Sequence, residues 1–316
     1  MLVIHGRGFK PPAESLADVS LAALRAGVER DYPEHLHLYD ETSVDLVYYG
    51  DLTNELLRGR DKDYDHQIDI GDRSNALAQL RNINVRKKFG IRQYDMRPGK
   101  SALPEFCANF IAPLCGLLGL TKTLLSRLSP DFAEYLVAES EYAKECRNRF
   151  RKALCERLDR GDRIMVVSHG TGSVIVYDVL WQLSHDARFT EDYGDKKIDT
   201  WLTLGAPLGD NYIRKHLLAA KQRDISYPKN VINWHNVSAE DDYVCHDNTL
   251  ADDFKDMLAQ KAVSAVQDYR VYNLAVRYGK SNPHSSVGYY IHPRVSKIMA
   301  DWVQTPVIHS DPELMI

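Results

Sequence analysis

Residues 162–175 read DRIMVVSHGTGSVI, and this stretch decides the fold class. Its first half contains an unbroken apolar run from Ile164 to Val167, which is typical of a parallel strand buried on both faces. A turn with two glycines follows, and the apolar residues from Val174 to Leu183 then recur at helical spacing. A strand, a tight turn and a helix in this order predict a βαβ unit.

Similar apolar runs recur along the chain. After the first of them, Pro11 and Pro12 precede a helical pattern with one apolar face. Strands that alternate with helices predict an α/β fold, with a mainly parallel sheet flanked by helices. The expected further strands are residues 2–4 (LVI), 44–49 (VDLVYY), 200–204 (TWLTL), 231–234 (VINW) and 269–276.

Residues 52–160 do not follow this alternation of strands and helices. The segment is too long for one crossover and carries the charged run RGRDKDYDH at 58–66. Its apolar residues follow helical spacing from residue 102 onward, and this pattern predicts one continuous helix over 131–158. We therefore expect a mostly helical insertion or lid within a single domain of residues 1–316. Its apolar stripe between residues 110 and 120 fits a helix packed under the insertion better than a lipid-facing surface.

Composition excludes several classes of protein. The chain has 40 Lys and Arg against 44 Asp and Glu, a formal charge of -4, so no global field favours nucleic acid. The longest apolar run, FIAPLCGLLGL, is shorter than the about 20 residues that span a bilayer, so no transmembrane segment is expected. The oligomeric state is not fixed by these features.

The five cysteines form no C-x-x-C pair, and the N-terminus lacks a signal-peptide pattern, which favours a cytoplasmic protein. His235, Cys245, His246 and Asp247 lie near one another in sequence, but their spacing matches no metal-ligand motif. We expect neither a metal nor a cofactor.

The turn itself carries a chemical signal. Ser168-His169-Gly170-Thr171-Gly172, between a strand and a helix, resembles the nucleophile elbow G-x-S-x-G of the α/β-hydrolase superfamily, in its lipase and esterase branch. Ser168 replaces the first glycine, and Gly170 stands where the family has its serine. An elbow nucleophile is held at a strained, positive φ that glycine adopts without penalty, but glycine has no Oγ. A plain tight turn or a phosphate-binding loop would have the same glycines.

The resemblance extends to the loop after the first strand. His5-Gly6-Arg7-Gly8 is similar to the HG loop that gives one backbone N–H to the oxyanion hole of this family. The resemblance implies Arg7 or Gly8 as that donor, and Thr171, which follows the nucleophile position, as the second donor.

The remaining triad members follow in the family's order of nucleophile, acid and histidine. Asp242 lies after the VINW strand in a neighbourhood similar to N-x-x-D-P-V, with Asp241 in reserve, and His284 follows the last strand. The turn TLGAPLG at 203–209 is similar to the family's T-x-G-S-P-x-G turn. The resemblance covers about residues 1–50 and 160–305. A solvated acidic loop and a surface histidine are the alternatives for these two residues.

The resemblance implies a serine-hydrolase-type protein that acts on a small or lipid-like ester, with an altered nucleophile position. Three explanations of Gly170 stay open. It can be an introduced replacement of serine, or the protein can activate water or recruit Ser173 or Ser168 as a surrogate nucleophile. In the third, the chain is a catalytically inactive hydrolase-fold binding or interaction protein.

Overall fold

The computed structural model describes residues 1–59, 64–83, 89–98, 129–221, 227–245 and 249–305. Six strands form one sheet in the order β2-β1-β3-β4-β5-β6, and every pairing in it is parallel. The predicted α/β fold with a parallel sheet is confirmed. The strands are β1 Leu2–Ile4, β2 Asp45–Val47, β3 Met165–His169, β4 Ile198–Leu204, β5 Val231–Ala239 and β6 Ala265–Val271.

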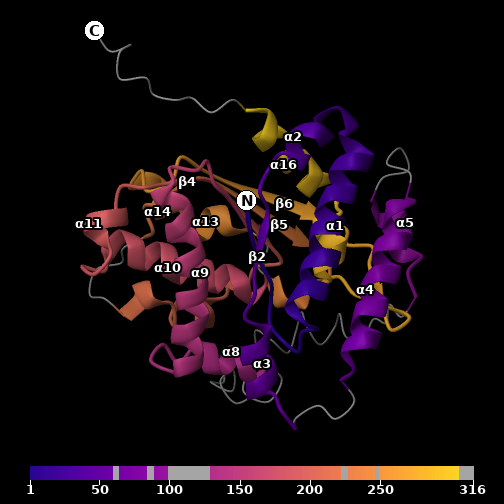
Figure 1. Cartoon of the computed structure of the whole chain (residues 1–316), viewed down its shortest axis with the longest axis horizontal. Helices are drawn as coiled ribbons and strands as arrows, with labels where there is room; N and C mark the ends of the chain where they lie inside the picture. Colours follow the sequence, from indigo (N-terminus) through magenta and orange to yellow (C-terminus); the bar gives the residue numbers. More distant parts are fainter. Residues whose placement is uncertain (60–63, 84–88, 99–128, 222–226, 246–248, 306–316) are drawn as a thin grey trace.

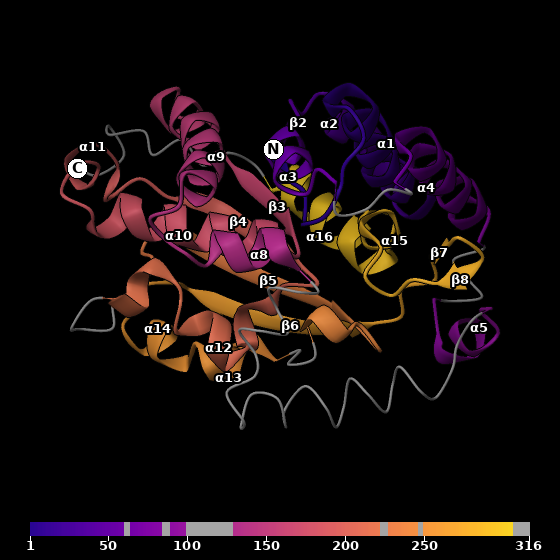
Figure 2. The same cartoon turned by 90° about the horizontal axis from the view of Figure 1, so that it is seen from below.

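Helices cover both faces of the sheet (Figure 1). On one face, α1 (Ala13–Asp31) packs against α4 (His66–Arg81), α15 (Ser286–Tyr290) and α16 (Pro293–Gln304). On the other face, α9 (Glu141–Asp159) packs against α10 (Thr171–His185), as Figure 2 also shows. The further helices are α2 Leu36–Asp40, α3 Gly50–Leu56, α5 Ile91–Asp95, α8 Pro130–Tyr135, α11 Thr190–Tyr193, α12 Asn211–Arg214, α13 Leu250–Asp253 and α14 Lys255–Ala259.

The apolar run of β3 explains why the sheet is sandwiched. Val166 belongs to the core cluster shared with α9 and α10, whereas Met165 and Val167 belong to the cluster shared with α1 and α16. All three side chains are buried, because successive residues of a strand point to opposite faces. The parallel strands bring their carboxyl ends to one edge, where the loops after β1, β3, β4, β5 and β6 meet.

The single helix expected over residues 131–158 is wrong, because the chain breaks between α8 and α9. The hydroxyl of Ser140 accepts a 3.1 Å hydrogen bond from the N–H of Ala143 and caps the amino end of α9. A serine cap of this kind marks the start of a helix, and α8 has already ended at Tyr135. The apolar stripe expected at 110–120 lies outside the described residues.

The last predicted strand has shifted bounds, since β6 starts at Ala265 and ends at Val271 rather than covering 269–276. The buried side chain of Asn273 causes this end. Its amide donates to the carbonyls of Pro283 and Ser285, both at 2.9 Å, and its oxygen accepts from the N–H of Ala275 at 3.1 Å. The chain turns there and continues into the hairpin of β7 (Val276–Arg277) and β8 (Lys280–Ser281).

No helix among the described residues is long and apolar enough to cross a membrane. The expected insertion contributes α3, α4, α5, α8 and α9 to the described part of the chain. Of these, α9 packs on the face of the sheet and α4 packs against α1 and α15, so both are integrated into the layers.

Candidate active site

Gly170 forms the sharp turn between β3 and α10. Its backbone has φ 52° and ψ -124°, in the left-handed region that favours glycine. The N–H of Gly170 donates to the carbonyl of Leu204 at 2.9 Å, so the turn is tied to the end of β4. A Cβ atom on Gly172 would lie 2.6 Å from the carbonyl oxygen of His5, so only glycine lets the helix approach the loop after β1. Close packing therefore requires glycine at 172, whereas at 170 glycine relieves the strain of a positive φ.

Asp242 and His284 meet at this edge of the sheet. Asp242 follows β5, and its Oδ2 lies 2.8 Å from Nδ1 of His284. The same carboxylate accepts hydrogen bonds from the hydroxyl of Tyr289 at 2.7 Å and from the N–H of Val244 at 3.0 Å. His284 follows the β7–β8 hairpin and is positioned by the loop that Asn273 holds. The acid is buried, and both of its oxygens accept hydrogen bonds.

The electrostatics keep this acid ionised. Burial alone would raise the pKa of Asp242, but the attraction of His284 and the hydrogen bonds from His284, Tyr289 and Val244 outweigh it and lower the pKa. The pKa of Tyr289 is raised well above its usual value by burial and by the charge of Asp242, so its phenol stays a hydrogen-bond donor. An ionised Asp242 fixes His284 with a proton on Nδ1 and leaves Nε2 as an acceptor.

Nε2 of His284 faces the position of the residue 170 side chain. A Cβ atom on Gly170 would lie 3.1 Å from Nε2 and 3.4 Å from Cε1 of His284. Gly205, in the turn after β4, lies on the opposite side of the pair at φ 56°. A Cβ atom on Gly205 would lie 2.8 Å from Oδ2 of Asp242, so this glycine makes room for the acid and the histidine.

The expected reserve acid has another partner. Asp241 adopts φ 60°, and its Oδ2 accepts a 2.7 Å hydrogen bond from the hydroxyl of Tyr94 in α5. The structure therefore brings Asp242, and not Asp241, to Nδ1 of His284.

The backbone donors expected for an oxyanion hole differ in their availability. The N–H of Gly8 donates to Oδ2 of the buried Asp131 in α8 at 2.7 Å. The N–H groups of Arg7 and Thr171 make no hydrogen bond to any described residue. Thr171 is the first residue of α10, where the N–H points out of the helix, and the Cα of Gly6 lies 3.8 Å from the Cβ position of residue 170. Arg7 and Thr171 thus keep open donors beside the turn.

The buried side chain of Lys10 binds the carbonyl groups of the loop after β1. Its ammonium donates to the carbonyl oxygens of Arg7, Gly8 (3.1 Å) and Phe9 (3.3 Å). Burial, and next the charge of Arg73, lower the pKa of Lys10 to about 7. Three carbonyls on one buried amine fix the conformation of residues 7–9.

Two further histidines were not predicted from the sequence as parts of the site. His5 stacks on Tyr49 at 4.0 Å, and its Nε2 accepts from the Tyr49 N–H at 3.0 Å. His169 lies against His284 with ring centroids 4.5 Å apart and contacts its carbonyl through Nε2 at 3.1 Å. Burial lowers the pKa of both rings well below the usual value, so both are neutral supports. The HG motif pointed to His5 as part of a loop, but no spacing rule pointed to His169 as a support of His284.

The hydroxyls of Ser168 and Ser173 lie 2.9 Å apart, and both side chains are completely buried. The indole N–H of Trp201 donates to Ser168 at 2.9 Å. The structure therefore places these serines in a closed network on the sheet side of the turn.

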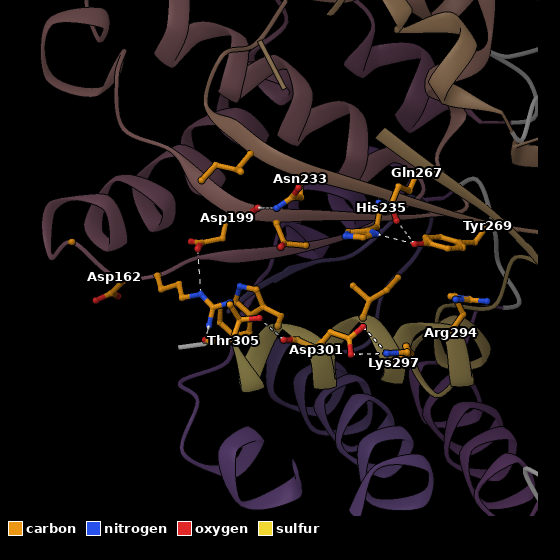
Figure 3. A pocket seen from close by; sticks show the side chains of 16 residues that line it. Asp162, Asp199, Asn233, His235, Gln267, Tyr269, Arg294, Lys297, Asp301 and Thr305 are labelled. Carbon is orange, nitrogen blue, oxygen red and sulfur yellow. Dashed lines mark hydrogen bonds and ion pairs between the residues drawn. The ribbon is translucent and has the colours of Figure 1, made fainter. Parts of the chain in front are cut away.

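A cavity of about 230 Å³ opens beside the pair, lined by residues of the loop after β1, by His169 and His284, and by Arg73 and Arg277. A larger cavity of about 710 Å³ lies near the amino ends of β4 and β5, against α16 (Figure 3). Four of its charged side chains form two ion pairs, Arg163 with Asp199 at 3.2 Å and Lys297 with Asp301 at 2.7 Å. The smaller cavity is the one that contains the candidate chemistry.

Among the residues that the structure describes, no three His, Cys, Asp or Glu side chains gather as a metal-binding group. His246 and Asp247 lie outside those residues. Searches of protein-family models, curated proteins and solved structures found no match to this chain.

Proposed function

We propose that this chain is an ester hydrolase of the α/β-hydrolase kind, with Asp242 and His284 as its acid and base. One observation carries the proposal: His284 binds Asp242 through Nδ1 at 2.8 Å and faces the side-chain position of Gly170 with Nε2. The strained turn, the acid after β5 and the histidine after β6 have the order that such a triad requires.

Gly170 offers no hydroxyl, so we propose that the base acts on water held in the place of a serine Oγ. His284 Nε2 takes one proton of that water as its oxygen attacks the ester carbonyl carbon. The resulting imidazolium is stabilised by the ionised Asp242. When the tetrahedral intermediate collapses, the C–O bond to the alcohol breaks and His284 returns the proton to the leaving alkoxide. The products are a carboxylic acid and an alcohol.

The N–H groups of Arg7 and Thr171 are the proposed donors to the oxyanion. Gly8 is not used in this scheme, because its N–H already binds Asp131. Preorganised donors of this type contribute about 3 kcal/mol each to transition-state stabilisation. When a triad member is missing, substrate binding and an oxyanion hole alone still accelerate hydrolysis roughly 10³ to 10⁴-fold over the reaction in water. The expected turnover is therefore slow.

A catalytically inactive binding protein is the second candidate, and the glycine at position 170 favours it. The same cavity would then hold a ligand without turning it over. This version needs neither the ionised acid nor an unoccupied Nε2, whereas the hydrolase needs both.

The deciding experiment follows hydrolysis of short p-nitrophenyl esters by the native chain and by His284→Gln. The matched control is His37→Gln, which changes an exposed histidine of α2. Hydrolysis that is lost in His284→Gln and kept in His37→Gln supports the hydrolase. Equal rates in all three proteins, or no hydrolysis above background, would leave the binding protein as the better description.

A further inference from the structure

We propose that the ligand of this cavity is a small ester that carries a carboxylate, which Arg73 and Arg277 bind beside His284. As a statement about a substrate, this rests on the function proposed above. The inference comes from the charges, the unused donors and the size of the cavity.

The cavity is lined by more basic than acidic side chains. Arg7, Lys10, Arg73 and Arg277 line it, and Asp72 is the acidic residue among its lining residues. Asp72 accepts a 3.1 Å hydrogen bond from the N–H of Tyr278. Basic side chains thus outnumber acidic ones among the residues that line the cavity beside the proposed general base, which favours a negatively charged ligand.

The two arginines already bind a carboxylate on their buried side. Asp69 in α4 is fully buried and lies 3.1 Å from Nε of Arg73 and 2.6 Å from Nη2 of Arg277. One carboxylate thus serves two guanidinium groups. The charge of Asp72 also acts on Arg277, so what the pair offers a ligand is its remaining N–H donors.

Donors remain unused in this pair. Nε of Arg277 is buried and has no acceptor in the part of the chain that the structure describes. Arg73 uses Nη1 for a 3.3 Å contact to the hydroxyl of Ser286, the first residue of α15. Among the described residues, Nη2 of Arg73 and Nη1 of Arg277 have no hydrogen-bond acceptor, and a ligand carboxylate could accept charge-assisted hydrogen bonds from them.

The charge of Arg73 also acts on Lys10. After burial, the charge of Arg73 is the next cause that lowers the pKa of this amine. A carboxylate in the cavity would oppose that repulsion. Lys10 is therefore a third group that gains from an anionic ligand.

Size restricts the ligand further. A volume of about 230 Å³ is below the about 300 to 1,000 Å³ of drug-sized ligand pockets. The apolar lining side chains are Leu16, Ala76 and Val276. A long acyl chain finds little apolar surface here, whereas a half-ester of a four-carbon diacid suits both the size and the charge.

The test is isothermal titration calorimetry of the native chain with monomethyl succinate and with dimethyl succinate. The first carries a carboxylate, and the second is its neutral ester. We expect monomethyl succinate to bind at least about tenfold more tightly, and added salt to weaken its binding selectively. Equal affinities for the two esters would overturn the proposal, and this comparison needs no variant.

Variants then test whether the carboxylate of monomethyl succinate binds at Arg277. Arg277→Gln should weaken monomethyl succinate about tenfold, while Arg277→Lys retains part of the affinity because it keeps the charge. Asp69 keeps Arg73 as a partner in both proteins. The control is Arg25→Gln, a half-exposed arginine paired with Asp40 on the surface, which should bind like the native chain. Unchanged binding in Arg277→Gln would also refute the proposal.

Binding and turnover separate the two proposals. Selective binding of monomethyl succinate without hydrolysis would refute the hydrolase and support the ligand class. Hydrolysis that depends on His284 but shows no preference for the anionic ester would support the hydrolase and refute the ligand class.

Discussion

The phenol of Tyr289 donates a 2.7 Å hydrogen bond to Oδ2 of Asp242, the same oxygen that binds Nδ1 of His284. Tyr289 is completely buried in α15, and its hydroxyl also accepts from the N–H of Ala239 at the end of β5. The tyrosine thus joins the strand that precedes the acid to the helix that follows the histidine. It acts as a positioning residue for the Asp242–His284 pair.

Replacing Tyr289 by Phe is expected to lower the free energy of unfolding by about 1 to 3 kcal/mol, because the N–H of Ala239 and an oxygen of Asp242 lose a partner while buried. Urea unfolding followed by circular dichroism measures this. The control is Tyr193→Phe, which removes a hydroxyl that binds Asp159 at the surface and should cost less than about 1 kcal/mol. Equal costs for the two variants would contradict a positioning role for Tyr289.

The stability contributed by Asp242 should depend on pH. Its pKa is lowered in the folded protein, so its contribution is present above the unfolded value of about 3.9 and is lost as the pH falls through the folded pKa. The Asp242→Asn variant has no ionisable side chain at this position, so it lacks this pH-dependent contribution to the unfolding free energy. The difference in unfolding free energy between the native chain and Asp242→Asn should therefore shrink as the pH falls below about 4. A difference that stays constant between neutral and acid pH would show that Asp242 is not held ionised.

The burial of Lys10 should make the stability depend on pH in the neutral to alkaline range. Its folded pKa of about 7 lies below its unfolded value, so the unfolded chain binds more protons between the two values and stability rises with pH there. Relative to Lys10→Met, the native chain should gain up to about 1.4 kcal/mol per pH unit between about pH 7 and about pH 10. Thermal or urea unfolding across this range measures the gain, and parallel curves for the two proteins would refute it.

A fluorophosphonate probe addresses the surrogate nucleophiles. Ser173 and Ser168 are buried and bind each other, so we expect no label on either residue in the native chain. Peptide mass spectrometry identifies the labelled position. Label on Ser173 that disappears in Ser173→Ala would show that the turn opens and that a surrogate serine operates.

The sequence predicted the elements that have a strong local pattern. The apolar run from Ile164 to Val167 and the alternation of strands and helices were enough to predict the parallel sheet. The resemblance to the α/β-hydrolase motifs implied Asp242, with Asp241 in reserve, and His284 at one edge of the sheet, and the structure has Asp242 and His284 2.8 Å apart there. The sheet could be predicted from strand burial and chain order, whereas the two site residues needed the motif resemblance as well.

Other features depend on long-range contacts that no local pattern displays. The end of β6 is set by Asn273, which binds carbonyls ten and twelve residues away. The choice between Arg7 and Gly8 depends on Asp131, which lies 123 residues further along the chain. The support of His284 by His169 and the room made by Gly205 likewise come from the meeting of separate loops.

Gly170→Ser is expected to create or strongly increase esterase activity toward short activated esters. The serine Cβ would lie 3.1 Å from Nε2 of His284 before relaxation, so the ring must move by a few tenths of an ångström. The hydroxyl then comes within hydrogen-bond reach of the base and attacks the ester carbon, the alcohol leaves, and water activated by His284 hydrolyses the acyl-enzyme to release the acid. The gain should disappear in Gly170→Ser/His284→Gln and in Gly170→Ser/Asp242→Asn.

Gly170→Ala is the matched control, since it brings the same Cβ into the same left-handed backbone without the hydroxyl. Both variants should lose about 1 kcal/mol of stability from the positive φ and the contact with His284. The alanine protein should show no more activity than the native chain, while the serine protein is labelled at residue 170 by the fluorophosphonate. A folded Gly170→Ser protein that resembles Gly170→Ala in both assays would mean that the cavity is not built for acyl transfer, and the binding protein would then be the better description, because the geometry around His284 would be present without its chemistry.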